Sequence, residues 1–83
     1  MKITVTKTVL VEEELKVEDL VVGISGRRDA DSQNIEIFYK DVAIGYGHIN
    51  IRTNWAHITL NEDNQELEDF LVEGIENRTI ILR

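Results

Sequence analysis

Between residues 35 and 60, apolar side chains recur at every second position, and three short turn-forming pairs interrupt them. Such alternation is typical of strands that bury one face of a sheet. If two-residue turns lie at residues 40–41, 47–48 and 53–54, all of these apolar side chains point to the same face. A slip of one residue would turn the whole row toward solvent, so this stretch predicts an antiparallel meander.

The meander also predicts which residues face each other. Its last two strands are expected at residues 49–52 and 55–60. The alternative to the middle turn is one long strand that is bent by a bulge at Gly45 or Gly47. The expected cross-strand pairs are Tyr39 with Val42, Ile37 with Ile44, Ile35 with Tyr46, Tyr46 with Ile49, Ile44 with Ile51, Ile51 with Ala56, and Ile49 with Ile58.

An amphipathic helix is predicted over residues 62–73. Leu67, Phe70 and Leu71 follow the i, i+3, i+4 spacing of one helical face. Asn61 is the expected N-cap, because its short side chain can accept a free backbone N–H of the first turn. Gly74 is the expected end of the helix. The apolar face is expected to pack on the sheet against Ile37, Ile44, Ile49, Ile51 and Ile58.

The same helix carries a stripe of acids, Glu62, Glu66, Asp69 and Glu73, which fall within about 60° of one another at 3.6 residues per turn. Residues 61–76 hold seven acids and no Lys or Arg, and seven is also the magnitude of the chain's net charge of −7. Like charges at helical spacing destabilise a helix. The stripe is therefore either a solvated face that keeps the protein in solution or a surface that meets a basic partner.

The other segments complete the expected fold. Residues 3–11 alternate Ile and Val with Thr and predict a strand, and residues 17–24 predict a short helical turn that runs into another strand. Residues 26–34 are expected to form a polar loop and residues 79–82 a short final strand. The sequence thus predicts one α+β domain over residues 1–83, a mostly antiparallel sheet of about five strands covered on one face by one helix.

Composition excludes several classes of site and partner. The chain has no cysteine, so disulfides, thiolate catalysis and cysteine-ligated metals are excluded, and a reducing, cytoplasmic location is expected. No apolar run has the length of a signal-peptide core or of a membrane span. A pI near 4.7 argues against nucleic acid or an anionic membrane as a direct ligand.

Fragments of chemical motifs fail on inspection. The fragment that begins at Gly45 has Asn50 where a dinucleotide fingerprint needs its third glycine. A calcium loop that begins at Asp29 would have Lys40 where a glutamate must ligate the ion. His48 and His57 could hold a divalent metal only with a third ligand, and the meander places no carboxylate beside them. We therefore predict no catalytic residue, metal or cofactor.

Trp55 is a candidate anchor for a partner. The expected register places it opposite Arg52 and away from the core, where the two could form a cation–π pair. Trp and Arg are enriched among residues that dominate binding energy. The alternative is that the helix or the N-terminal segment covers Trp55.

These observations favour a non-enzymatic interaction protein. It would bind a basic surface of a larger protein, with Glu62, Glu66, Asp69, Glu73, Trp55 and Arg52 as the contact residues. Small acidic immunity proteins, antitoxins and phage inhibitors of nucleases are functional analogies. If the partner is a nucleic-acid enzyme, the acidic stripe would compete with phosphates and act as a partial mimic of DNA. The alternatives are a structural subunit of a phage particle or homo-oligomer that assembles through strand edges and, least favoured, a small metal-dependent enzyme using His48 and His57.

Overall fold

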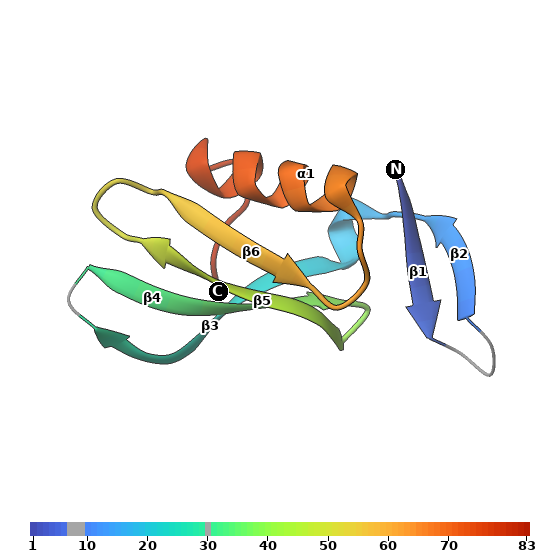
Figure 1. Cartoon of the computed structure of the whole chain (residues 1–83), viewed down its shortest axis with the longest axis horizontal. Coiled ribbons are helices and arrows are strands. Elements are labelled where there is room, and N and C mark those ends of the chain that lie inside the picture. The colour runs from blue at the N-terminus through green and yellow to red at the C-terminus, as the bar shows by residue number, and fades with distance from the viewer. Residues whose placement is uncertain (7–9, 30) are drawn as a thin grey trace.

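The computed structural model describes residues 1–6, 10–29 and 31–83. It contains two antiparallel sheets and one helix, so the predicted α+β class is confirmed (Figure 1). A hairpin of two strands stands beside a four-stranded meander of order β3-β4-β5-β6. The elements are β1 (Lys2–Thr6), β2 (Leu10–Glu14), the 3₁₀ turn η1 (Val17–Asp19), β3 (Leu20–Asp29), β4 (Ser32–Tyr39), β5 (Val42–Asn50), β6 (Ala56–Leu60) and α1 (Gln65–Glu76).

The N-terminal segment differs from the single strand predicted over residues 3–11. It forms two antiparallel strands in which Val5 faces Val11. The three consecutive glutamates at 12–14 lie within β2, although they interrupt the apolar alternation. The strand can carry them because Glu12 and Glu14 are exposed, while the Glu13 carboxylate accepts a hydrogen bond from Lys40 Nζ at 2.7 Å.

The connection from η1 into β3 is as predicted, but the polar loop at residues 26–34 is not. β3 continues to Asp29, and β4 begins at Ser32. Gln33 can lie inside this hairpin, with only 6% of its surface exposed, because its side-chain Nε2 donates to the carbonyls of Ser25 and Asn34, each at 3.1 Å. A satisfied polar side chain thus allows strand pairing to extend into a polar segment.

The first predicted turn of the meander is confirmed, and the second is wrong. Lys40 and Asp41 have φ angles of 51° and 65°, as in a type I′ hairpin, and Tyr39 faces Val42. β5 then runs without a turn from Val42 to Asn50. The register shifts between β4 residues 37 and 38, whose partners are Gly45 and Ala43. Ile44, which lies between these two partners, is therefore a bulge beside Gly45. This matches the alternative predicted from the sequence, one long strand bent by a bulge.

The last turn is longer than predicted. β6 pairs with β5 through Ile49 opposite Ala56, so the expected pairs of Ile51 with Ala56 and Ile49 with Ile58 are wrong. Asn50 explains the difference, because its Oδ1 accepts the backbone N–H groups of Arg52 and Thr53 at 3.0 and 3.1 Å. This side chain starts the turn at the end of β5, which draws residues 51–55 into the connection.

The helix is displaced from its predicted range of 62–73. Its N-cap is Asn64, not Asn61, and the Asn64 Oδ1 accepts the backbone N–H of Leu67 at 3.1 Å. Gly74 does not end the helix, because α1 continues to Glu76. A Cβ at Gly74 would lie 2.4 Å from Cδ1 of Ile80, so this glycine lets the returning chain pack closely on the helix.

The core lies between one face of the meander, the buried face of α1 and the hairpin. Phe70 is half-buried and packs against this core from its margin, and Ile44 and Ile51 are also only partly buried. After the helix the chain returns to the edge of β3, where Leu82 forms a parallel bridge with Val22, so the strand predicted over residues 79–82 is reduced to a single bridge. The core residues are Ile3, Val22, Ile35, Ile37, Tyr39, Ile49, Ala56, Ile58, Leu67, Leu71 and Ile75.

Candidate functional site

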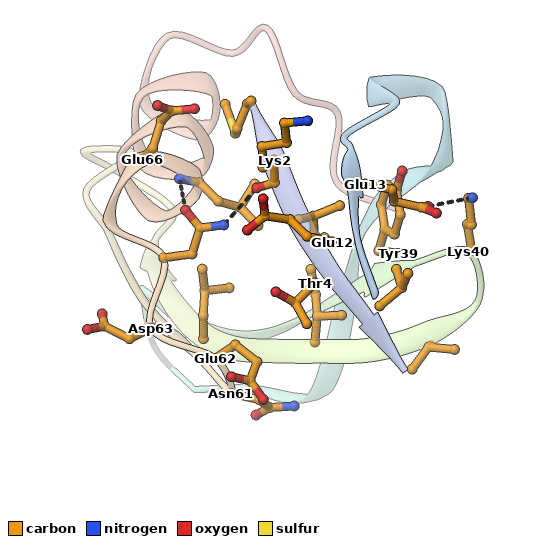
Figure 2. Close-up of a pocket in the computed structure, with 18 of the residues that line it drawn as sticks. Lys2, Thr4, Glu12, Glu13, Tyr39, Lys40, Asn61, Glu62, Asp63 and Glu66 are labelled. Atoms are coloured by element: carbon orange, nitrogen blue, oxygen red, sulfur yellow. Dashed lines mark hydrogen bonds and ion pairs between the residues drawn. The ribbon is translucent and has the colours of Figure 1, made fainter. Parts of the chain in front are cut away.

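A cleft of about 830 Å³ opens between the hairpin and the end of the meander (Figure 2). Three parts of the chain form its walls. One wall is β1 with β2, the second is the β4–β5 turn with the start of β5, and the third is the loop at residues 61–64 with the first turn of α1. The cleft therefore depends on the hairpin, which the sequence did not predict.

The floor of the cleft is apolar. It joins the hydrophobic core directly, because Ile3, Tyr39 and Leu67 belong to both and are almost fully buried. Lys16 donates its backbone N–H to the Tyr39 hydroxyl at 3.0 Å, so the buried phenol is satisfied and its ring serves as apolar surface. The apolar residues that line the cleft include Ile3, Val5, Tyr39, Val42, Ala43, Ile44, Leu60 and Leu67.

The rim of the cleft is acidic. Six carboxylates and two lysines line it, which gives a side-chain charge of −4. Both lysines have acidic neighbours: Lys40 Nζ lies 2.7 Å from a Glu13 oxygen, and Lys2 Nζ lies 3.9 Å from a Glu14 oxygen. In the described part of the chain, no cation lies within 4.0 Å of the remaining carboxylates. We call these four residues, Glu12, Glu62, Asp63 and Glu66, the open carboxylates.

The Asn64 side chain joins two walls of the cleft. While its Oδ1 caps α1, its Nδ2 donates to the carbonyl of Lys2 in β1 at 3.0 Å. The loop before it is held to the start of β5, because Asn61 donates its backbone N–H to the Ile44 carbonyl at 2.8 Å. These bonds set the open carboxylates of the loop across from Glu12 of the hairpin (Figure 2).

Two ion pairs hold the hairpin wall. The Met1 amino group donates to Glu14 Oε1 at 2.5 Å, and this hydrogen bond raises the pKa of the amino group and lowers the pKa of the Glu14 carboxyl. The hydrogen bond from Lys40 to Glu13 likewise raises the pKa of the Lys40 ammonium. Both pairs lie at the exposed rim, where they orient the strands and contribute little to stability.

A second surface feature lies at the far end of β6. His48 faces His57 across β5 and β6, and their ring centroids are 5.6 Å apart. The Trp55 ring lies 5.6 Å from His48 and 6.2 Å from His57. We call these three residues the aromatic cluster. Trp55 retains 52% of its surface exposure, so neither the helix nor the N-terminal segment covers it.

Arg52 is not part of the aromatic cluster. The expected pairing of Arg52 with Trp55 fails because the longer turn moves Arg52 out of the strand. Its Nε instead lies 3.8 Å from a carboxylate oxygen of Asp31. The histidines of the cluster have no third metal ligand, and no group of three or more His, Cys, Asp or Glu in the described residues could hold a metal ion.

The structure divides the contact residues predicted from the sequence. Glu62 lies in the loop before α1, and it lines the cleft together with Glu66. Asp69 and Glu73 are exposed on later turns of the helix, outside the cleft lining. Trp55 and Arg52 lie at the opposite end of β6. Sequence reasoning missed Glu12 and Asp63, although the run of glutamates at 12–14 was a visible signal.

No protein-family model, curated protein or solved structure matches this chain. Across the described residues, the structure has no helix that is long and apolar enough to cross a membrane. The cleft combines an apolar floor with the open carboxylates at its rim. Such a site can take a ligand that is both apolar and cationic.

Proposed function

We propose that this chain is a non-enzymatic interaction protein whose cleft binds a basic, partly apolar segment of a larger protein. The observation that carries the proposal is that one cleft combines an apolar floor with an acidic rim. A solvated acidic face needs no concave shape, whereas this hollow brings carboxylates from the hairpin, the loop and the helix around buried apolar side chains.

The two parts of the cleft would act differently on a ligand. Apolar burial on the floor supplies most of the affinity. The open carboxylates raise the rate of encounter with a cationic segment and reject acidic ones. Low-dielectric walls concentrate the field of such charges, which favours the cleft over the acids of the helix face.

A partner that handles nucleic acid fits this chemistry well. Its binding surface carries Lys and Arg for phosphates, and the open carboxylates would take the place of those phosphates. The protein would then act as an inhibitor or adaptor, by analogy with immunity proteins, antitoxins and phage proteins that block host nucleases. We place this interaction in the cytoplasm of a bacterium or an infecting phage's host, since a cysteine-free chain fits a reducing compartment.

Two variants with matched charge test the proposal. The cleft variant carries Glu62→Gln, Asp63→Asn and Glu66→Gln. The helix variant carries Glu68→Gln, Asp69→Asn and Glu73→Gln, and it changes the net charge equally without altering the cleft lining. Each immobilised protein captures partners from a lysate of the source organism. We expect a basic partner to bind the wild type and the helix variant and to be lost from the cleft variant.

Salt dependence is the second readout of this experiment. Capture by the wild type is expected to weaken as salt rises, because exposed charges are screened beyond a Debye length of about 8 Å at physiological ionic strength. Equal capture by all three proteins would contradict the proposal. Loss from the helix variant alone would move the site to the acidic stripe of α1.

Self-assembly is the second candidate function. The hairpin is a sheet of only two strands, so in the described structure no strand lies beside the outer edge of β2, and another chain could extend it there. The edges of the meander are partly occupied, since Arg83 bonds to β3 and Glu76 accepts the backbone N–H of Ala56 in β6. Molar mass by light scattering separates the two candidates, because a monomer at tens of micromolar contradicts assembly.

A further inference from the structure

We infer that the partner segment binds in an extended conformation, as a strand added to the free edge of β1. This inference rests on the proposed function and specifies the conformation and residue pattern of the ligand. Strand addition is an established mode of peptide recognition, in which backbone hydrogen bonds give affinity and alternate side chains give specificity.

The hydrogen-bond pattern of the hairpin identifies the free edge. Leu15 donates its backbone N–H to the Met1 carbonyl at 2.8 Å, which makes these two residues a hydrogen-bonded pair. In an antiparallel ladder, such pairs alternate with pairs whose peptide groups point away from the partner strand. The register of β1 with β2 therefore directs the peptide groups of Lys2 and Thr4 away from β2.

This edge of β1 faces the cleft. Asn64 already uses it, because its Nδ2 donates to the Lys2 carbonyl from the loop side. Figure 2 shows β1 with β2 on one side and the loop residues Asn61, Glu62 and Asp63 on the other. Within the described residues, no side chain or backbone group occupies the edge at Thr4. The cleft thus contains a backbone donor and acceptor that a ligand can pair.

The edge favours an extended ligand over a helical one. A helix satisfies its own backbone groups, so it would cover the Thr4 N–H and carbonyl and leave them without partners. Covering a polar group without a replacement hydrogen bond is unfavourable. An added strand instead pairs with both groups.

The two faces of the hairpin specify the sequence pattern of the ligand. Ile3 and Val5 point to the apolar floor, so alternate residues of an added strand would lie beside them and should be apolar. The intervening residues would lie on the opposite face, between Glu12 of the hairpin and the open carboxylates of the loop and α1, and should be basic. A second copy of this chain does not fit, because its net charge of −7 would meet an acidic rim.

Synthetic peptides of one composition test the inference by fluorescence anisotropy. The first peptide alternates Lys and Val over eight residues, and the second contains the same residues at helical spacing. Two further copies of the alternating peptide carry backbone N-methyl groups on all Lys residues or on all Val residues. The cleft variant defined above is the control for location.

We expect the alternating peptide to bind at least about tenfold more tightly than its permuted copy, and the cleft variant to lose this binding. One methylation pattern should weaken binding by about tenfold or more, since it removes the donors that face β1, and the other should leave it nearly unchanged. If methylation of the Lys residues weakens binding, the ligand strand runs antiparallel to β1. In that arrangement the ligand residue paired with Thr4 has its side chain on the same face of the sheet as Thr4, so it is a Lys and its N–H donates to Thr4.

Two results would overturn the inference in different ways. If the permuted peptide binds as well, or if both methylation patterns have equal effects, the ligand is not paired as a strand, although the cleft still binds basic segments. If the alternating peptide binds the wild type and the cleft variant equally, or binds neither, the proposed function fails together with the inference.

Discussion

The acidic cleft and the aromatic cluster lie at opposite ends of β6, and they offer a partner different things. The cleft is concave, is apolar at its floor and has four open carboxylates. The aromatic cluster is half-exposed, but its three rings contact one another, and none of them belongs to the lining of the cleft. Exposure of a tryptophan is therefore a weaker indication of a site than a group of carboxylates without ion-pair partners around buried apolar surface.

The two regions also depend on different parts of the fold. The cleft needs α1 in place, since the helix supplies Leu67 and Glu66 and its cap holds β1. The cluster needs β5 and β6 at close approach, because His48 and His57 face each other across these strands. Substitutions can therefore disturb one region more than the other.

The largest effect on stability is expected from Leu71→Ala, because the Leu71 side chain lies on the buried face of α1 and is 0% exposed. The substitution should lower the free energy of unfolding by about 2–5 kcal/mol and loosen the helical wall of the cleft. Urea denaturation followed by circular dichroism measures the change. Phe70→Ala is the matched control and should cost less, since Phe70 is only half-buried. A larger loss for Phe70→Ala would show that the core is assigned wrongly.

Gly47→Ala should disturb the cluster end of the sheet. A Cβ at Gly47 would lie 2.2 Å from the His57 carbonyl oxygen, so β5 and β6 must separate to accept it. We expect destabilisation of about 1–3 kcal/mol, typical of overpacking, and an altered Trp55 fluorescence spectrum. Gly23→Ala is the control, because its Cβ would meet Phe38 at an ordinary 3.6 Å. Equal thermal midpoints for the two variants would argue against the close approach of the strands.

Trp55→Ala separates the two regions directly. Loss of its ring contacts should lower the free energy of unfolding by about 0.5–1.5 kcal/mol, a typical value for aromatic pairs. Binding of a basic partner in the cleft should be unchanged, because Trp55 is not part of the cleft lining. Calorimetric titration of the wild type and the variant with that partner measures this. Weaker binding by the variant would include Trp55 in the contact surface, as the sequence predicted.

The smallest expected effect is a pH dependence confined to the hairpin. The hydrogen bond from the Met1 amino group lowers the Glu14 pKa from its ordinary 4.5. This bond therefore stabilises the hairpin above pH 4.5 and is lost as the pH falls through the lowered pKa. The amino pKa is raised from its ordinary 8.0, so the same bond is present below pH 8.0 and is lost as the pH rises through the raised pKa.

Amide hydrogen exchange in β1 and β2 reports this dependence. Protection of the hairpin should be greatest between the two ordinary pKa values, whereas protection at the aromatic cluster should follow the rest of the sheet. Glu14→Gln should remove the pH dependence of amide protection in the hairpin. An unchanged profile in this variant would show that the ion pair does not hold the hairpin wall.

Periodicity predicted the parts of the fold that depend on one buried face. The antiparallel pairing and the turn at residues 40–41 follow from the alternation of apolar residues, and the packing of a helix on the sheet follows from the helical spacing of Leu67, Phe70 and Leu71. Several of the errors arose where one polar side chain redirects the chain. Asn50 begins a turn early, Asn64 replaces Asn61 as the N-cap, and Gln33 supports pairing in an expected loop. Hydrogen bonds of this kind depend on tertiary neighbours, which periodicity does not reveal.

The candidate site was predictable only in its charge. The excess of acids near the helix N-terminus marked Glu62 and Glu66, which line the cleft. The hollow itself requires the hairpin to stand beside the end of the meander, and the single strand predicted over residues 3–11 could not suggest it. Glu12 meets these residues only through that hairpin. The predicted stripe also included Asp69 and Glu73, because helical spacing cannot tell where another element forms a wall.

Chemical shift mapping tests the central claim most directly. The ¹⁵N-labelled protein is titrated with a basic, partly apolar peptide, and the backbone amides and the Trp55 indole are followed together. We predict that the perturbed amides lie in β1, the start of β5 and the loop at residues 61–64, while the indole of Trp55 does not move. Perturbations that centre on Trp55, His48 and His57, or that follow Asp69 and Glu73 along the helix, would contradict the assignment of the cleft as the binding site.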